Sequence, residues 1–288
     1  MKITLHKPKK RVNRSMFGNI SILIVLLLVA AFMLLPFIYS VVQAFKPMEE
    51  IFAYPPRFFV QNPTLENFSE LWRISDSLWI PFSRYFFNTL FVTVVGIIAS
   101  MALSTLAAFP LAKYDFPGNA AFSKLITMTL LFTGPVTALP QYIIVTKLGM
   151  FDTFWAVLLP TIGGPLNIFL IKNFLTQVPD SMLEAATLDG ASKMKILTRI
   201  CLPLVKPAML TTLIFTFQAM WNSTGGNYIV SEDMKLLPTM MSQLSTGGIA
   251  RTGVGAASSV LMILPSLIIF CLTQSKIVET MAYSGIKE

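Results

Sequence analysis

Charged residues are absent from six long stretches of the chain, and this pattern predicts how the chain folds. No Asp, Glu, Lys or Arg occurs in residues 15–45, 85–112, 125–146, 153–171, 207–231 and 252–275. Each stretch supplies the roughly 20 residues that cross a hydrocarbon core as a helix. Helices are expected because a spanning segment must satisfy its own backbone hydrogen bonds. The sequence therefore predicts an all-α polytopic membrane bundle with six transmembrane helices.

The polar segments between these stretches predict the organisation of the chain. We expect a cytoplasmic basic tail at 1–18, a first transmembrane helix at 19–45 and a five-helix core at 85–276, followed by a cytoplasmic tail at 277–288. The loops expected outside the membrane are extracytoplasmic segments at 46–84 and 223–255 and a cytoplasmic segment at 173–206. A short amphipathic helix is expected around 65–73. The first apolar segment is longer than the ~7–15 residues of a signal peptide, which favours an uncleaved anchor.

Composition and charge support a membrane location. The chain is 54% hydrophobic and 12% charged, whereas soluble domains are about 25% charged. The net charge of +8 follows the expected topology, because 15 of the 22 Lys and Arg residues fall in the segments expected in the cytoplasm, which are 1–18, a short turn at 113–124, 172–206 and 276–288. This asymmetry is typical of an inner-membrane protein with both termini inside. It explains the basic excess without nucleic acid as a partner.

The chain lacks the residues that several kinds of chemistry require. No GxxxxGK[ST] motif is present, so the sequence predicts no ATP hydrolysis by the chain itself. The only histidine is His6, and Cys201 and Cys271 lie far apart without a CxxC motif, so we expect neither a catalytic site nor a metal site. The spans contain no ionisable residue of the kind that secondary transporters use as proton relays.

The loop before the fifth span has the pattern of two short helices. Ser181 and Glu184 have capping-box spacing at the start of the first helix. Gly190 can take the left-handed conformation that ends it. A second helix is expected from Ser192, and Pro203 is expected to close it. From the residues alone, two interpretations are equally good: an element that docks on a cytoplasmic protein, or an amphipathic hairpin on lipid headgroups.

The residues of this loop resemble the coupling motif of ABC-importer permeases. The sequence Glu-Ala-Ala, a glycine four residues later and the pattern Ile-x-Leu-Pro stand at that family's spacing. The resemblance implies that a cytoplasmic coupling hairpin at 180–203 docks in a cleft on an ATPase subunit. The residues that it assigns to this contact are Glu184, Ala185, Ala186, Asp189, Gly190, Ala191, Ile200, Leu202 and Pro203.

Further segments resemble the carbohydrate-uptake branch of that family. Asn88-Thr89-Leu90, the segment 107–113 and Trp221-Asn222 are similar to family motifs, although Ser223-Thr224-Gly225-Gly226 departs from the common continuation. The end of the chain is similar to the tail of the maltose-permease G-type subunit. The resemblance implies that this tail reaches the interface of an ATPase dimer, through Tyr283, Ser284, Gly285, Ile286 and Lys287.

The resemblance also implies the partners. It predicts a heterodimer with a second homologous permease, two ATPase subunits that hold ATP and Mg, an extracytoplasmic sugar-binding protein and surrounding membrane lipid; this chain itself would need no cofactor. An oligosaccharide is the expected cargo, and a glycerol-phosphodiester or other small polar solute is an alternative. A hypothesis of another class is a membrane scaffold that recruits a cytoplasmic protein without transport.

A few polar and aromatic side chains lie within or at the ends of the apolar stretches. Amides and aromatic rings suit neutral ligands rich in hydroxyl groups, so these side chains are candidates for lining a sugar path. The alternative is that they form hydrogen bonds between helices, or that a Trp anchors the chain at the interface. The candidates are Asn88, Asn167, Gln218, Trp221 and Asn222, with Trp155 and Tyr228 as further stacking faces.

Overall fold

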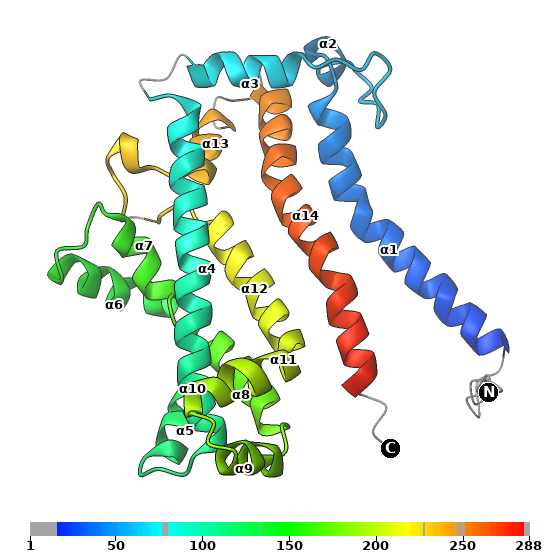
Figure 1. Cartoon of the computed structure of the whole chain (residues 1–288). Coiled ribbons are helices and arrows are strands. Elements are labelled where there is room, and N and C mark those ends of the chain that lie inside the picture. The colour runs from blue at the N-terminus through cyan, green and yellow to red at the C-terminus, as the bar shows by residue number, and fades with distance from the viewer. Residues whose placement is uncertain are drawn as a thin grey trace.

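The computed structural model describes residues 16–76, 80–132, 134–226, 228–245, 248 and 251–284. All regular elements in these residues are helices, which confirms the all-α class (Figure 1). Four of them are long and apolar enough to cross a membrane, and the number rises to six if each of two bent helix pairs is one span. The predicted polytopic bundle is therefore confirmed.

The helices follow one another with short connections. In chain order they are α1 (Met16–Ala44), α2 (Met48–Ile51), α3 (Glu66–Asp76), α4 (Phe82–Lys113), α5 (Asn119–Thr129), α6 (Gly134–Lys147), α7 (Phe154–Thr161), α8 (Pro165–Thr176), α9 (Asp180–Leu188), α10 (Lys193–Ile196), the π-helical turn η1 (Leu197–Cys201), α11 (Leu202–Leu204), α12 (Lys206–Trp221), the 3₁₀ turn η2 (Glu232–Met234), α13 (Leu237–Ser245) and α14 (Thr252–Ser284).

The amphipathic helix expected near 65–73 is α3, which lies across one end of the bundle (Figure 1). Its buried residues, Leu71 and Ser75, pack over the ends of the long helices. The Asn67 amide donates to the carbonyls of Ala44 (2.9 Å) and Lys46 (2.7 Å), which fixes α3 to the end of α1. We call this end of the bundle the α3 end, and the opposite end, where α9 and α10 lie, the hairpin end.

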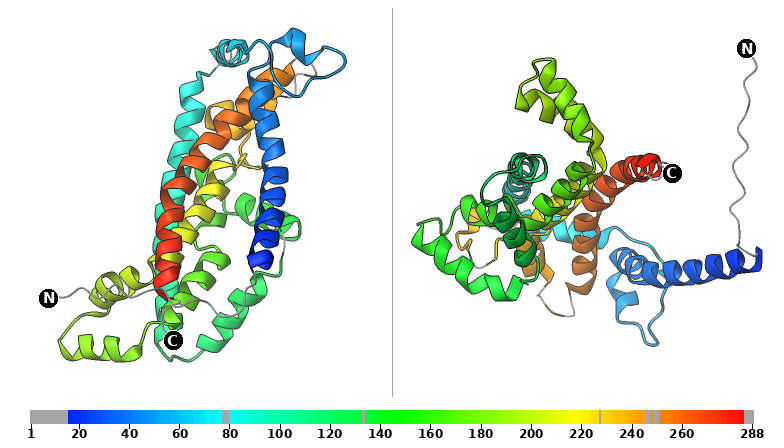
Figure 2. Two further views of the ribbon diagram at one scale, coloured as in Figure 1. Left: turned by 90° about the vertical axis from the view of Figure 1, so that its right-hand side faces the viewer. Right: turned by 90° about the horizontal axis from the view of Figure 1, so that it is seen from below.

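The helix α4 is the centre of the fold, and α8 and α12 pack along it. Small residues on its buried face, including Gly96, Ser100 and Ser104, allow the helices to approach closely. A Cβ atom at Gly96 would lie 2.9 Å from the Cε of Met220 on α12. By contrast, α1 meets α14 near the α3 end and diverges from the bundle toward the hairpin end (Figures 1 and 2). Its apolar side chains are left facing outward, as expected for a helix in lipid.

Three of the predicted spans are not single straight helices. The third is divided into α5 and α6, which meet at 112°, and the fifth is entered through a bend of 84° between α11 and α12. The fourth consists of α7 and α8, separated at Gly163, whose φ is +74°. Pro165 and Pro207 stand in the first turn of the following helices. Proline is tolerated there because its missing N–H would have no partner inside the helix.

Candidate functional site

The tight turn predicted at Gly190 is present. Gly190 has φ +75°, its N–H donates to the Thr187 carbonyl (3.0 Å), and the N–H of Ala191 donates to the Ala186 carbonyl (2.9 Å). This pair of bonds satisfies carbonyls at the end of α9 in the manner of a Schellman cap. Ser192 then caps α10 by accepting a hydrogen bond from the Lys195 N–H (3.4 Å). The chain from α9 to α11 therefore forms a helix–turn–helix, which we call the hairpin; its first arm is α9, and its second arm consists of α10, η1 and α11.

The ends of the hairpin differ from the sequence prediction. The predicted capping box is wrong, since α9 begins after Pro179 without a side-chain cap. Pro203 does not close the second arm either, because it lies in the first turn of α11 and the chain stays helical through η1 to Leu204. Pro203 contributes no backbone N–H, but the helical turn continues past it, because the Val205 N–H still donates to the Cys201 carbonyl (3.0 Å). The second arm ends at the bend beside Val205 instead.

The two arms of the hairpin are buried to different extents. Ile196, Leu197 and Cys201 of the second arm pack in a buried cluster with α8 and the end of α4. The first arm and the turn face outward, and Leu188 is 89% exposed. The motif residues follow this division only in part, because Ala186 of the first arm packs against the cluster and Pro203 of the second arm is exposed. The other exposed motif residues are Glu184, Ala185, Asp189 and Gly190, while Ala186, Ala191, Ile200 and Leu202 pack partly against the buried cluster.

The end of α4 holds both arms of the hairpin. The Lys113 ammonium group donates to the Val178 carbonyl (2.5 Å) and to the Asp180 carboxylate (2.7 Å), directly before and at the start of α9. The next residue, Tyr114, presents its ring to the Lys193 ammonium of α10, 4.6 Å from the ring centroid. This is within cation–π range. In the sequence Lys113 stands out only as the last residue of the 107–113 motif, and its role follows from tertiary contacts that no sequence pattern shows.

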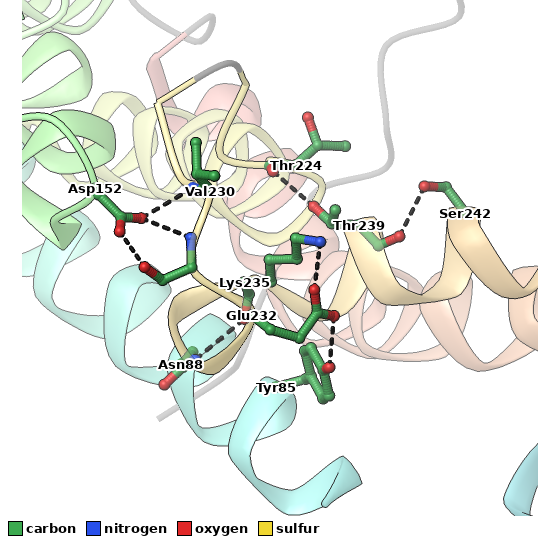
Figure 3. Close-up of polar contacts among 10 residues, drawn as sticks. Tyr85, Asn88, Asp152, Thr224, Val230, Glu232, Lys235, Thr239 and Ser242 are labelled. Atoms are coloured by element: carbon green, nitrogen blue, oxygen red, sulfur yellow. Dashed lines mark hydrogen bonds and ion pairs between the residues drawn. The ribbon is translucent and has the colours of Figure 1, made fainter. Parts of the chain in front are cut away.

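A second polar network fixes the long loop between α12 and α14 at the α3 end (Figure 3). The Asp152 carboxylate accepts hydrogen bonds from the backbone N–H groups of Val230 and Ser231 (both 2.9 Å) and from the Ser231 hydroxyl. The hydroxyl first, and then the two N–H groups, lower the pKa of Asp152. Asp152 has φ +58°, so the turn before α7 is shaped to present this carboxylate to the loop.

The start of α4 binds the same loop a few residues further on. The Asn88 amide donates to the carbonyls of Asp233 (2.8 Å) and Lys235 (3.1 Å), and the Tyr85 hydroxyl donates to the Glu232 carboxylate (2.8 Å). Figure 3 shows these side chains pointing from α4 toward the turn η2. The loop is therefore held at several points by α4 and by the turn before α7.

The five candidates for the sugar path divide into two groups. Asn88 is directed at η2, Asn167 donates to Ser100 and Thr216 between α8, α4 and α12, and the Trp221 indole donates to the Met262 carbonyl on α14. These three bind elements of the bundle to one another. Gln218 and Asn222 instead lie on an exposed face of α12.

The predicted tail contact lies largely outside the described residues. Tyr283 and Ser284 form the last residues of α14 at the hairpin end, and Gly285, Ile286 and Lys287 are not described. Among the described residues no group of His, Cys, Asp and Glu side chains has the arrangement of a metal site.

Up to six candidate spans in the described residues, arranged as a bundle with broken helices, define a polytopic membrane protein. The chain belongs to the family of binding-protein-dependent transport system inner membrane components, whose sequence profile matches residues 15–277. The resemblance to ABC-importer permeases is thereby confirmed, and the chain is a multi-pass inner-membrane component of such a system.

Two curated relatives and one solved structure indicate the range of this similarity. The chain is 33% identical to the polygalacturonan/rhamnogalacturonan transport permease YtcP of Bacillus subtilis, over 69% of this chain and 67% of YtcP. It is 27% identical to the arabinooligosaccharides transport permease AraQ of Halalkalibacterium halodurans, over 88% of this chain and 90% of AraQ. A chain of a bacterial ABC transporter involved in alginate import has the same fold, with a TM-score of 0.76 at 22% identity, covering 91% of this chain and 98% of that chain.

Proposed function

We propose that this chain is one of two permease subunits of an ABC importer for an oligosaccharide. It pairs with a second permease, receives cargo from an extracytoplasmic sugar-binding protein and is driven by two ATPase subunits. Both termini and the hairpin lie in the cytoplasm, and the α3 end faces outward. Membership of the family supports the importer. YtcP and AraQ, which are named as permeases for carbohydrates, support the cargo class.

The observation that carries the coupling role is the exposed tip of the hairpin. Leu188 is 89% exposed beside Gly190, and Met182 and Met194 of the same hairpin are 44% and 57% exposed. Several large apolar side chains exposed on one otherwise polar segment indicate a surface that a partner covers. The second arm is anchored in the bundle. A force applied to the tip by closing ATPase subunits is therefore transmitted to α4 and α8 instead of being absorbed by a loose loop.

The glycine in the turn provides the test. No atom lies within 4 Å of a Cβ placed on Gly190, so a substitution there meets only the strain of φ +75°. For a β-branched residue that conformation is a true outlier, and a left-handed residue costs about 1–2 kcal/mol. We expect Gly190→Val to deform the docking tip and to abolish most ATP-driven sugar uptake in proteoliposomes that contain the complete complex, while the chain still inserts into the membrane.

Gly149 supplies a matched control for this experiment. It has φ +67° and an equally open Cβ position, but lies in the turn between α6 and α7. Gly149→Val introduces comparable strain away from the hairpin, so uptake should stay near the wild-type rate. Normal uptake by the Gly190→Val complex, at equal amounts of protein in the membrane, would show that the hairpin is not the coupling element.

A further inference from the structure

A cavity of about 280 Å³ lies between α6, α7 and the loop that follows α12. Its volume is near the lower limit of the ~300–1,000 Å³ typical of ligand pockets, so it suits one unit of a chain-like ligand better than a whole oligosaccharide. Polar side chains line it from three separate segments: Thr137 and Gln141 on α6, Thr161 on α7, and Ser223 and Tyr228 in the loop.

Several of these groups are not committed to the fold. The Gln141 amide and the Tyr228 hydroxyl make no hydrogen bond within the part of the chain that the structure describes. The Ser223 hydroxyl oxygen accepts from the Gly225 N–H (3.2 Å) and keeps its own proton available for donation. The Thr161 hydroxyl donates to the Val157 carbonyl (3.1 Å) and can still accept. The cavity therefore offers both donors and acceptors.

The cavity wall is also uncharged. Tyr228 is the only ionisable residue among those that line it, and no Lys, Arg, Asp or Glu takes part. A carboxylate or phosphate bound against this wall would lose part of its hydration without an opposite charge to replace it, which is unfavourable. Hydroxyl and acetamido groups carry no such cost when they are hydrogen-bonded.

An exposed face of α12 leads to the cavity. Phe215, Gln218 and Asn222 lie on this face, and the next residue, Ser223, lines the cavity. The Asn222 amide donates to the Gln218 carbonyl (2.9 Å), while the Gln218 side chain makes no hydrogen bond within the described residues. This face is as free of charge as the cavity. The exposed α12 side chains next to the cavity therefore add two neutral amides and one aromatic ring.

We propose that this cavity is a carbohydrate subsite that binds one sugar unit through its hydroxyl groups and selects a neutral glycan over a uronate or a phosphodiester. The proposal rests on the importer function proposed above and adds the class of sugar. It distinguishes this chain from transporters named for acidic polysaccharides, such as YtcP and the alginate importer. Gln141 and Tyr228 bind the sugar directly, and the Tyr228 ring, stacked on Tyr142 with centroids 6.1 Å apart, keeps a fixed orientation.

The test uses the complete complex in proteoliposomes and four radiolabelled probes: maltotriose, arabinotriose, diacetylchitobiose and trigalacturonate. We expect ATP-driven uptake of at least one neutral probe and none of trigalacturonate. Gln141→Leu and Tyr228→Phe should each raise the KM for that neutral probe about 3- to 10-fold with little change in maximal rate, as expected for the loss of one hydrogen bond made throughout binding.

Tyr142→Phe is the matched control, because it removes the same hydroxyl from the stacked ring that does not line the cavity. Its KM should equal that of the wild type. Uptake of trigalacturonate, or an unchanged KM in both cavity variants of a complex that transports a neutral probe, would overturn the subsite. Failure of the wild-type complex to take up any of the four probes would overturn the proposed importer of oligosaccharides itself, and the subsite with it.

Discussion

Replacing Lys113 by Met is expected to loosen the hairpin from the bundle. Only 2% of the Lys113 side chain is exposed, and its ammonium group bridges the Val178 carbonyl and the Asp180 carboxylate. Methionine keeps the length and the apolar stem but removes the charge and the donors. The change therefore isolates the polar contact from the packing around it.

The two bonds contribute unequally. The Asp180 side chain is 75% exposed, and a pair with an exposed partner contributes at most about 1 kcal/mol. The bond to the Val178 carbonyl involves a charged donor on a nearly buried side chain, and such bonds contribute about 1.5–3 kcal/mol. We therefore expect Lys113→Met to lower the free energy of local opening of α9 by about 2–3 kcal/mol, and Asp180→Asn to lower it by less than half of that.

Hydrogen exchange of the backbone amides in α9 measures this opening directly. Since about 1.4 kcal/mol corresponds to a tenfold change, amides of 182–190 should exchange about 30- to 150-fold faster in Lys113→Met. Lys172→Met is the control, because Lys172 makes a comparable contact to Ser123 (2.6 Å) between α8 and α5, away from the hairpin. Exchange in α9 that is unchanged by Lys113→Met, or accelerated equally by Lys172→Met, would refute the assignment of Lys113 as the anchor.

Two further predictions concern the α3 end. Hydrogen bonds from Ser231 and Val230 lower the pKa of Asp152 in the folded protein. The ionised carboxylate therefore stabilises the folded loop at pH values above the ordinary pKa of an Asp side chain. This stabilisation is lost as the pH falls through the lowered pKa of the folded state. The difference in melting temperature between wild type and Asp152→Asn should thus be constant from pH 8 to 5 and shrink below about pH 4. Gly253→Ala places a methyl group against the Asn67 carboxamide, which its two hydrogen bonds hold in place. The melting temperature of this variant should fall by several degrees. Gly18→Ala, whose added methyl group has no neighbour within 4 Å, should leave the melting temperature unchanged.

The sequence predicts those features of the fold that depend on local chemistry. The hairpin turn follows from a glycine that must take a left-handed conformation, and the spans follow from the missing charges. Prolines alone do not show where a span breaks, since Pro36, Pro110 and Pro265 lie inside continuous helices. The breaks at Gly134-Pro135 and Gly164-Pro165 instead combine a glycine with the proline, which is a local signal in the sequence.

Features that depend on residues far apart in the chain could not be predicted from the sequence. The predicted capping box is absent because α9 begins at Asp180, which places Ser181 inside the first turn instead of before it. The contact that fixes this start is the bond from Lys113, 67 positions earlier, to the Asp180 carboxylate. Likewise, Asn167 and Gln218 are both amides in apolar helices, and only packing decides that one bridges Ser100 and Thr216 while the other faces outward. Amide chemistry makes both roles available, and the tertiary structure assigns them.

A single helix connects the two regions that the proposed transport cycle requires. The 32 residues of α4 span about 48 Å; its first turns hold η2 through Tyr85 and Asn88, and its last residue holds the start of α9 through Lys113. A displacement of the hairpin must therefore move α4 or break the Lys113 bonds. If α4 moves as a rigid body, η2 moves with it, because its backbone carbonyls are bound to the same helix. Coupling between the ATPase side and the outer loop then needs no chain of small side-chain shifts, since one helix is attached at both ends.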